Sequence, residues 1–364
     1  MAGSFYGTIF SITTWGESHG AGIGVVVDGC PSGIPLSEAD IQKYLNRRKP
    51  GQSKYTTMRN ESDSAEILSG VFEGKTTGTP ISILVRNTDQ RSRDYGKIKN
   101  CYRPGHADYT FDAKYGFRDY RGGGRSSGRE TIGRVAAGAI AAKILKELGI
   151  HVQAYTKAIG NIVIPSIEYD YSCINNNKLY MPNNDYADKA SSYLEDCIKN
   201  QNSSGGIIEC IVTGMPAGIG EPVFEKLDAN LAKAVMSIGS VKGVEIGDGF
   251  HVSASLGNEN NDSFSFRDGI IKNTNHSGGI LGGISDGDKI ILRAAIKPTP
   301  SIGLEQKTVT TTGEETTLQI TGRHDPVIVP RAVVVVESMV AITLVDMLCV
   351  NMSSKIDYFK KLYR

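Results

Sequence analysis

The chain has 364 residues, of which 40% are apolar and 22% are charged. These proportions are typical of a globular protein with a substantial core, and they exclude a disordered or fibrous chain. The net charge of +1 argues against a general nucleic-acid-binding protein, because that function needs a broad basic surface.

Predicted strands and helices alternate irregularly along the chain. Short apolar runs predict strands at 23–27, 80–85, 207–212 and 289–296. Helical spacing and capping residues predict helices from Ser37, the expected N-cap, through Asn46, and at 130–148, 227–238 and 337–349. A polar excursion at 166–204 is predicted to carry one surface helix, 186–200. No regular strand–helix–strand repeat is present, which favours an α+β fold.

The six cysteines form neither CxxC pairs nor zinc-finger spacings. The N-terminus lacks the pattern of a secretory signal, and no uninterrupted run of about 18 apolar residues is present. The scattered histidines have no metal-ligand spacing. We therefore expect a cytoplasmic protein with reduced thiols, no metal site and no membrane contact.

Arginine and glycine are concentrated in one region of this nearly neutral chain. The run 120–130, within the wider segment Arg118–Arg134, contains three consecutive glycines and directly precedes the predicted helix at 130–148. Free N–H groups at a helix start bind anions, and Arg125, Ser126 and Ser127 would add donors. The alternative is a flexible solvated loop. The run matches neither a P-loop nor a dinucleotide-binding fingerprint.

Three further loops carry potential acid–base residues. His19 lies in Gly16–Gly20, a run with GxSxG spacing; a nucleophile elbow would require a helix directly after it, whereas a strand is predicted there. His106 lies in Arg103–Asp108, where the aspartate either orients the histidine or closes the turn. Gly322–Pro326 carries an arginine and an aspartate suited to anion binding and proton transfer.

Other loops remain open to two interpretations each. Lys297–Ser301 suits either phosphate binding or an ordinary strand exit. The cations of Asn46–Pro50 are explained at least equally well by the preceding helix C-terminus. The glycine loop Asn275–Gly283 would suit a flat ring system or a plain mobile turn.

Taken together, these motifs resemble those of chorismate synthase. The matching runs follow the family's order: Thr14–Gly20, Gly78–Pro80, Asn87–Ser92, Arg103–Asp108, Asp119–Ser127, Val241–Gly249, Gly278–Ser285 and Gly322–Pro326. The resemblance implies a single catalytic domain over 1–364, with helices sandwiched between antiparallel sheets, and a homotetramer. It also implies a lyase that makes chorismate from 5-enolpyruvylshikimate 3-phosphate by 1,4-anti elimination of phosphate, at the end of the shikimate pathway to the aromatic amino acids. Reduced FMN is needed, without net redox change.

The resemblance also implies roles for individual residues. His19 would protonate the departing phosphate, His106 would supply a proton at the flavin pyrimidine edge, and Asp325 with Ser127 would relay the proton at flavin N5. Substrate or NADP contacts would come from Arg48, Lys54 and Arg134. Cofactor contacts would come from Arg125, Ser126, Ser127, Gly239, Ser240, Gly282, Lys297, Pro298, Thr299, Pro300, Ser301 and Arg323.

Two departures from relatives bear on the cofactor. Lys54 stands where relatives often have arginine, so a point charge replaces a planar fork and weakens the expected pyridine-nucleotide contact. The chain lacks the long insertions of relatives that reduce their own flavin, so NADPH is expected to act only through an external reductase. The alternatives are a flavin-dependent oxidoreductase acting on a small phosphorylated acid and a non-catalytic anion- or RNA-binding module.

Overall fold

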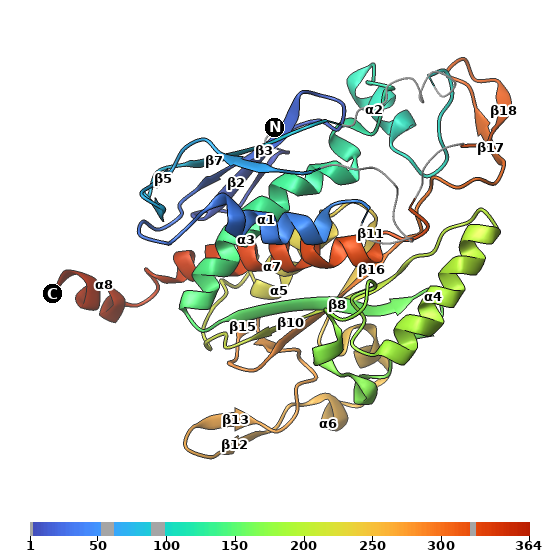
Figure 1. Cartoon of the computed structure of the whole chain (residues 1–364). Coiled ribbons are helices and arrows are strands. Elements are labelled where there is room, and N and C mark those ends of the chain that lie inside the picture. The colour runs from blue at the N-terminus through green and yellow to red at the C-terminus, as the bar shows by residue number, and fades with distance from the viewer. Residues whose placement is uncertain (1–2, 52–61, 89–98, 321–324) are drawn as a thin grey trace.

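A computed structural model describes residues 3–51, 62–88, 99–320 and 325–364. Two antiparallel sheets enclose a layer of helices (Figure 1). The first has the order β1–β2–β3–β7–β4, formed by Phe5–Tyr6, Ser11–Gly16, Gly22–Asp28, Ile81–Arg86 and Ala65–Ile67. The second has the order β11–β16–β10–β8–β9, formed by Val241–Ile246, Ile290–Ile296, Gly206–Thr213, His151–Ile159 and Ile162–Val163. The predicted α+β sandwich is confirmed.

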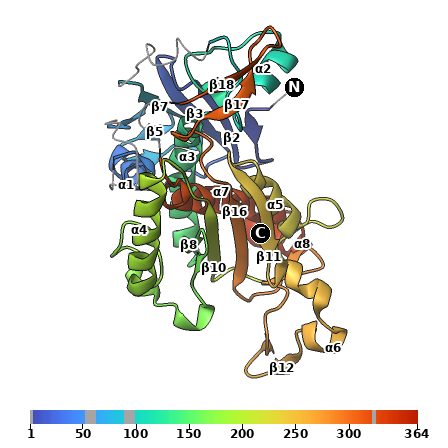
Figure 2. The same ribbon diagram turned by 90° about the vertical axis from the view of Figure 1, so that its right-hand side faces the viewer.

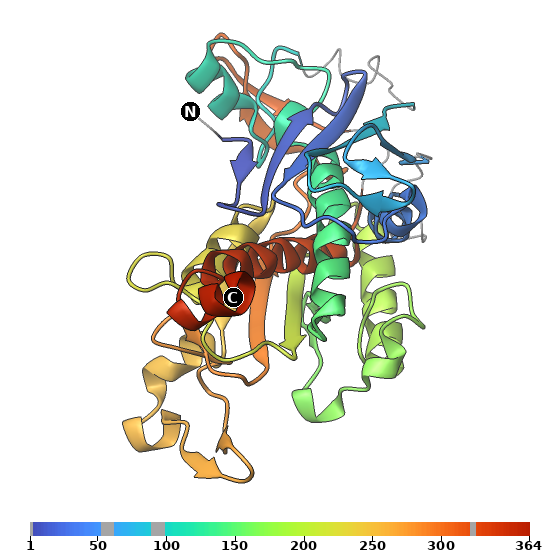
Figure 3. The ribbon, with the colours of Figure 1, turned by 90° about the vertical axis from the view of Figure 1, so that its left-hand side faces the viewer.

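The helices of the inner layer lie between the two sheets, as the two side views show (Figures 2 and 3). They are α1 (Glu38–Arg48), α3 (Thr131–Glu147), α5 (Leu227–Met236) and α7 (Val329–Asn351). Helix α3 packs on β3, α7 packs on β8 and β10, and the two helices cross. Outside this layer lie α2 (Asp108–Tyr115), α4 (Asn184–Lys199), α6 (Gly257–Asn260) and α8 (Ile356–Tyr363).

Short hairpins extend from the sandwich: β5–β6 (Val71–Phe72, Lys75–Thr76), β12–β13 (Phe264–Phe266, Ile270–Lys272), β14–β15 (Ile280–Leu281, Ile284–Ser285) and β17–β18 (Gln306–Val309, Glu315–Leu318). The last hairpin lies beside α2 (Figure 1). The backbone N–H of Tyr102 donates to the Val309 carbonyl at 3.1 Å, which fastens the segment before His106 to this hairpin.

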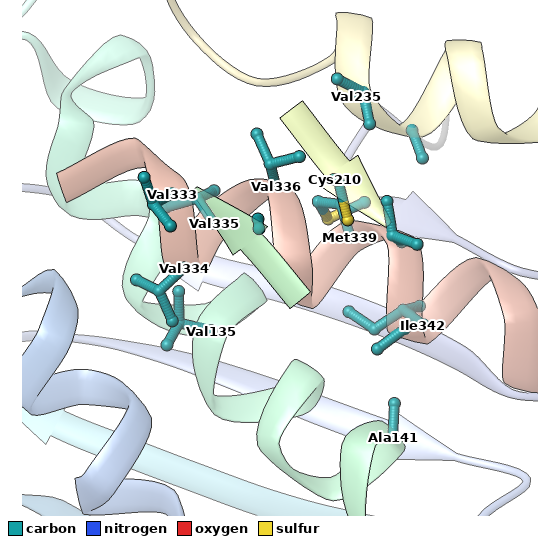
Figure 4. Close-up of a cluster of buried hydrophobic side chains, with 14 of the residues drawn as sticks. Val135, Ala141, Cys210, Val235, Val333, Val334, Val335, Val336, Met339 and Ile342 are labelled. Carbon is teal, nitrogen blue, oxygen red and sulfur yellow. The ribbon is translucent and has the colours of Figure 1, made fainter. Parts of the chain in front are cut away.

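The core is built where α3 and α7 cross between the sheets. Figure 4 shows valines of α7 packed among side chains from α3, β10 and α5. Gly138 of α3 permits the crossing, because a Cβ at this position would lie 2.6 Å from the Cα of Ser338 on α7. Close helix approach therefore depends on a missing side chain.

Helix α7 differs most from its prediction. It begins at Val329, whereas the prediction began at Glu337. The prediction missed the first turns because they are almost entirely buried, and their apolar run therefore shows no helical periodicity. By length and composition α7 could cross a membrane, and it is the one such helix among the described residues. However, 83% of its apolar window is buried inside the fold, as expected for a core helix.

The other predicted elements are present with small shifts at their ends. Ser37 caps α1 in a capping box with Asp40, and Gly149 follows α3 with φ of 72°. Strands β2, β8 and β11 were not predicted, because mixed polar residues interrupt their alternation. All six cysteines are free.

Candidate active site

The glycine-rich run forms two tight turns, Gly124–Ser126 and Gly128–Glu130, that lead into α3. Ser127 caps the second turn by accepting a hydrogen bond from the N–H of Arg129 at 3.3 Å. Arg125 donates to the carbonyls of Thr14 and Gly16, both at 3.1 Å, and to the Thr14 hydroxyl at 2.7 Å. These acceptors are neutral oxygens at the end of β2, so Arg125 holds the turn against the first sheet while its charge remains available to an anion.

His19 lies directly against this turn. A Cβ on Gly122 would overlap the His19 ring and would lie 3.2 Å from the Ser18 hydroxyl, so glycine is required for the approach. The Ser18 hydroxyl lies 3.1 Å from His19 Nδ1. Strands β2 and β3 flank Ser18, so the structure has no strand-to-helix elbow at this serine.

Asn87 joins the two loops and had no predicted role. Its amide nitrogen donates to the carbonyls of Glu17 and Gly20 at 3.0 and 2.8 Å. Its amide oxygen accepts from Nε and Nη2 of Arg129 at 3.1 and 2.8 Å. One half-buried amide therefore fixes the His19 loop relative to the start of α3. Its position within the matching run Asn87–Ser92 was the only signal in the sequence.

His106 is held at both ring nitrogens. Nδ1 lies 3.0 Å from the Pro104 carbonyl, and Nε2 lies 2.9 Å from the Ser301 hydroxyl. Burial, followed by the charge of Arg103, lowers the pKa of His106 below its ordinary value. Asp108 accepts two hydrogen bonds from the Arg103 side chain at 2.7 and 2.8 Å, so it closes the turn, which was one of the two predicted alternatives.

The loop 297–301 meets the His106 turn directly. Lys297 Nζ donates to the Gly105 carbonyl at 2.8 Å, and Pro300 packs on Gly105. The N–H of Lys297 donates to the Ser240 carbonyl at 2.9 Å, which brings the Gly239–Ser240 segment to the same place. Three segments far apart in the sequence therefore meet here, and all three carry predicted cofactor contacts.

Arg48 is buried rather than facing an open pocket. Its side chain is 2% exposed, and Nη1 pairs with Asp63 at 2.7 Å. Its remaining nitrogens donate to the Thr131 hydroxyl and the Gly128 carbonyl at 3.0 and 3.2 Å. Burial lowers the pKa of Arg48 to about 9, with the charge of Asp63 opposing the shift. Arg48 thus fastens the end of α1 to the start of α3.

Asp325 lies close to Arg48, because Arg331 of α7 donates hydrogen bonds to both residues. Arg331 Nη1 donates to the Asp325 carboxylate at 2.6 Å, and its Nε donates to the Arg48 carbonyl at 3.1 Å. Sequence patterning did not single out Arg331, because it lies in the first turn of α7, outside the predicted helix. Arg331 therefore fixes the position of the Asp325 carboxylate relative to the end of α1.

Arg134 projects from the first turns of α3 toward the C-terminal end of α5. Its Nε pairs with Glu130 at 2.9 Å, and its Nη1 donates to the Ser237 hydroxyl at 2.6 Å. Ser237 lies two residues before Gly239 and three before Ser240. Arg134 therefore lies beside the segment 237–240, whose Ser240 carbonyl accepts from the N–H of Lys297.

Gly282 lies apart from the other predicted cofactor residues of the described chain. It forms the tip of β14–β15, where the neighbouring Gly283 carbonyl accepts from the N–H of Leu227 at the start of α5. Ser240 follows the other end of α5, and a helix of ten residues is about 15 Å long. Lys54 and Arg323 lie outside the described residues.

The α+β fold and these converging histidine, arginine and glycine loops define an enzyme that acts on small anionic molecules. A sequence model of chorismate synthase matches residues 10–349. Chorismate synthases of Lachnoclostridium phytofermentans and Agathobacter rectalis are 66% and 63% identical to it, each comparison covering 100% of both chains. A crystal structure of chorismate synthase superposes with a TM-score of 0.77 at 31% identity, covering 98% of this chain and 96% of that one.

The chain belongs to the chorismate synthase family. Its function is accordingly that of a carbon–oxygen lyase, and the resemblance inferred from eight ordered motifs is confirmed. The alternative of a flavin-dependent oxidoreductase is not favoured.

Proposed function

We propose that this chain eliminates phosphate from 5-enolpyruvylshikimate 3-phosphate by a 1,4-anti reaction, with reduced FMN as its cofactor. The observation that carries the proposal is the meeting of the His106 turn, the Lys297 loop and Ser240, with His19 and the glycine-rich turn contributed by the first sheet. Substrate and cofactor together carry two phosphates and two carboxylates, so arginine, lysine and backbone donors are the required partners.

The residues present fit a phosphorylated ring cofactor. The Thr299 hydroxyl is buried and has no hydrogen-bond partner among the described residues, so it is available to a bound group. A Cβ on Gly239 or Gly124 would meet no heavy atom within 4 Å, which leaves space beside the backbone. We assign cofactor binding to Arg125–Ser127, Gly239–Ser240, Lys297–Ser301 and Arg323. Gly282 lies at the opposite end of α5 from Ser240, so it would contact the cofactor only if a second subunit of the proposed tetramer brought it there.

The side chains divide the chemistry between them. His19 donates a proton to the departing phosphate, whose charge Arg134 and Arg323 neutralise, because phosphate leaves readily only when its charge is compensated. Asp325 and Ser127 move the proton lost from the substrate, and Arg331 holds the Asp325 carboxylate in position for that purpose. His106 supplies a proton at the pyrimidine edge of the cofactor. The electron-rich reduced flavin would assist removal of the weakly acidic allylic hydrogen.

Assembly, location and cofactor supply complete the proposal. We propose a cytoplasmic homotetramer of a single catalytic domain that receives reduced FMN from a separate reductase using NADPH. Exposed phenylalanines support assembly: Phe250, Phe264 and Phe266 are 79%, 60% and 78% exposed on the segment around β12–β13. Light scattering coupled to size exclusion tests the tetramer.

The decisive experiment supplies the named substrate and catalytic reduced FMN under argon, and measures phosphate release together with flavin absorbance. Many turnovers without net flavin oxidation are expected. Stoichiometric flavin oxidation would instead support the oxidoreductase. Sustained turnover with only NADPH and oxidised FMN would contradict the need for an external reductase.

A further inference from the structure

The two partners of His106 determine where its ring carries a proton. The Pro104 carbonyl, 3.0 Å from Nδ1, can only accept a hydrogen bond. Nδ1 must therefore carry hydrogen in both the neutral and the protonated ring. In the neutral ring Nε2 then has a free lone pair, and the Ser301 hydroxyl 2.9 Å away donates to it.

Protonation of His106 reverses the direction of the second hydrogen bond. Once Nε2 carries a proton, it donates to the Ser301 oxygen, and the serine hydroxyl hydrogen becomes free to point elsewhere. The serine is the only one of the two partners that can both donate and accept. Any proton that leaves the ring without breaking the Pro104 contact must leave through Nε2, and the nearest atom there is Ser301 Oγ.

We propose that Ser301 relays the proton that His106 delivers to the bound cofactor, and that the Pro104 carbonyl directs this proton to Nε2. The inference deepens the proposed function, on which it rests. In the step, the Nε2–H bond breaks as hydrogen passes to Ser301 Oγ, and the serine's own hydrogen passes to an anionic atom of the cofactor. The ring ends neutral and still carries hydrogen on Nδ1.

The surroundings favour a ring that gives up its proton. Arg103 and Lys297 face His106 with positive charge, and Asp108 opposes them with a carboxylate. Because Asp108 is bound to Arg103, its negative charge is largely compensated. Lys297 also holds the Gly105 carbonyl, so the histidine turn and the serine loop keep their spacing.

Nitrogen-15 NMR of histidine-labelled protein tests the tautomer without turnover. His106→Gln identifies the resonances among the six histidines. Above the pKa of His106 we expect a protonated Nδ1 and an unprotonated Nε2, in the presence and absence of FMN, and below that pKa we expect hydrogen on both nitrogens. A neutral ring that carries its hydrogen on Nε2 rather than on Nδ1 would overturn the inference.

Turnover measurements separate the relay from a loop defect. Ser301→Ala should lower kcat roughly 10²-fold, at the lower end of acid–base effects, and Ser301→Thr should recover most of it. Ser203→Ala is the matched control, because Ser203 donates to the Thr299 carbonyl of the same loop without touching His106. Its kcat should stay near wild type.

The outcomes distinguish the relay from the proposed function itself. If His106→Gln is inactive while Ser301→Ala keeps the wild-type kcat and pH profile, the relay is wrong and the role of His106 stands. If His106→Gln is itself fully active in chorismate formation, the proposed role of His106 fails and the relay fails with it. Loss of activity in Ser203→Ala equal to that in Ser301→Ala would also overturn the relay, because it would show a loop defect.

Discussion

Replacing Asp63 by alanine tests whether the Arg48 cluster supports the fold or binds a ligand. Asp63 pairs with Arg48 at 2.7 Å and with Arg129 at 3.1 Å, and its own side chain is fully buried. Without it, two buried guanidinium groups lose the carboxylate that they share. Breaking such a pair costs about 3–5 kcal/mol, a large part of a typical unfolding free energy of about 5–15 kcal/mol.

Urea denaturation of the wild type, Asp63→Ala, Arg48→Met and the double variant Arg48→Met/Asp63→Leu measures this cost. The double variant should recover part of the stability lost in Asp63→Ala, because it removes one of the two guanidinium groups that lose their carboxylate, while Arg129 keeps its hydrogen bonds to Asn87. Substrate KM is measured on the variants that fold. A double variant with wild-type stability and a greatly raised KM would refute a structural role and restore Arg48 as the ligand clamp that the resemblance implies.

Four shorter predictions follow from other contacts. His19→Ala and His106→Ala should each lower anaerobic phosphate release by roughly 10²–10⁴-fold, and near wild-type rates would remove that residue from the mechanism. Gly122→Ala should displace the His19 ring and abolish most activity, whereas Gly128→Ala, whose Cβ meets no heavy atom within 4 Å, should not; equal losses would contradict the packing argument. Gly138→Ala should lower the unfolding free energy by about 1–3 kcal/mol through overpacking against Ser338, and adding Ser338→Gly should restore only part of this loss in the same denaturation assay, because the Cα of residue 338 stays 2.6 Å from the new Cβ. Hydrogen bonds from Arg103 outweigh burial and lower the pKa of Asp108, so its stabilising effect is present above the unfolded pKa of about 3.9 and is lost as pH falls through the lower folded value; acid titrations of Asp108→Asn should lack this component.

Local chemistry made some elements predictable from the sequence. Helix α3 has an apolar stripe, a glycine-rich start and a glycine stop at Gly149, so its bounds were predicted nearly to the residue. The start of α7 was not predictable by periodicity, because burial on every side removes the amphipathic signal. Strand β8 was missed for a related reason: its polar Tyr155 and Thr156 are buried through tertiary contacts that no local pattern encodes.

The candidate site shows the same division. Histidine, glycine and arginine loops could be recognised because few other roles explain those residue types together. Their partners could not, since a hydrogen bond between distant segments leaves no local signature. Asn87 and Arg331 illustrate this limit: each is an ordinary polar residue until the fold places it between two loops.

Strand register explains which of the predicted loops meet. Antiparallel pairing places Val241 at the start of β11 opposite Ile296 at the end of β16. The residues just before β11 and just after β16 must therefore lie side by side, which is why Ser240 contacts Lys297. The Gly282 hairpin is instead fastened to the start of α5, so its motif predicted a ligand-binding glycine loop without indicating its position. Motif chemistry selects the candidate loops, and sheet pairing decides which of them can contact one ligand within one chain.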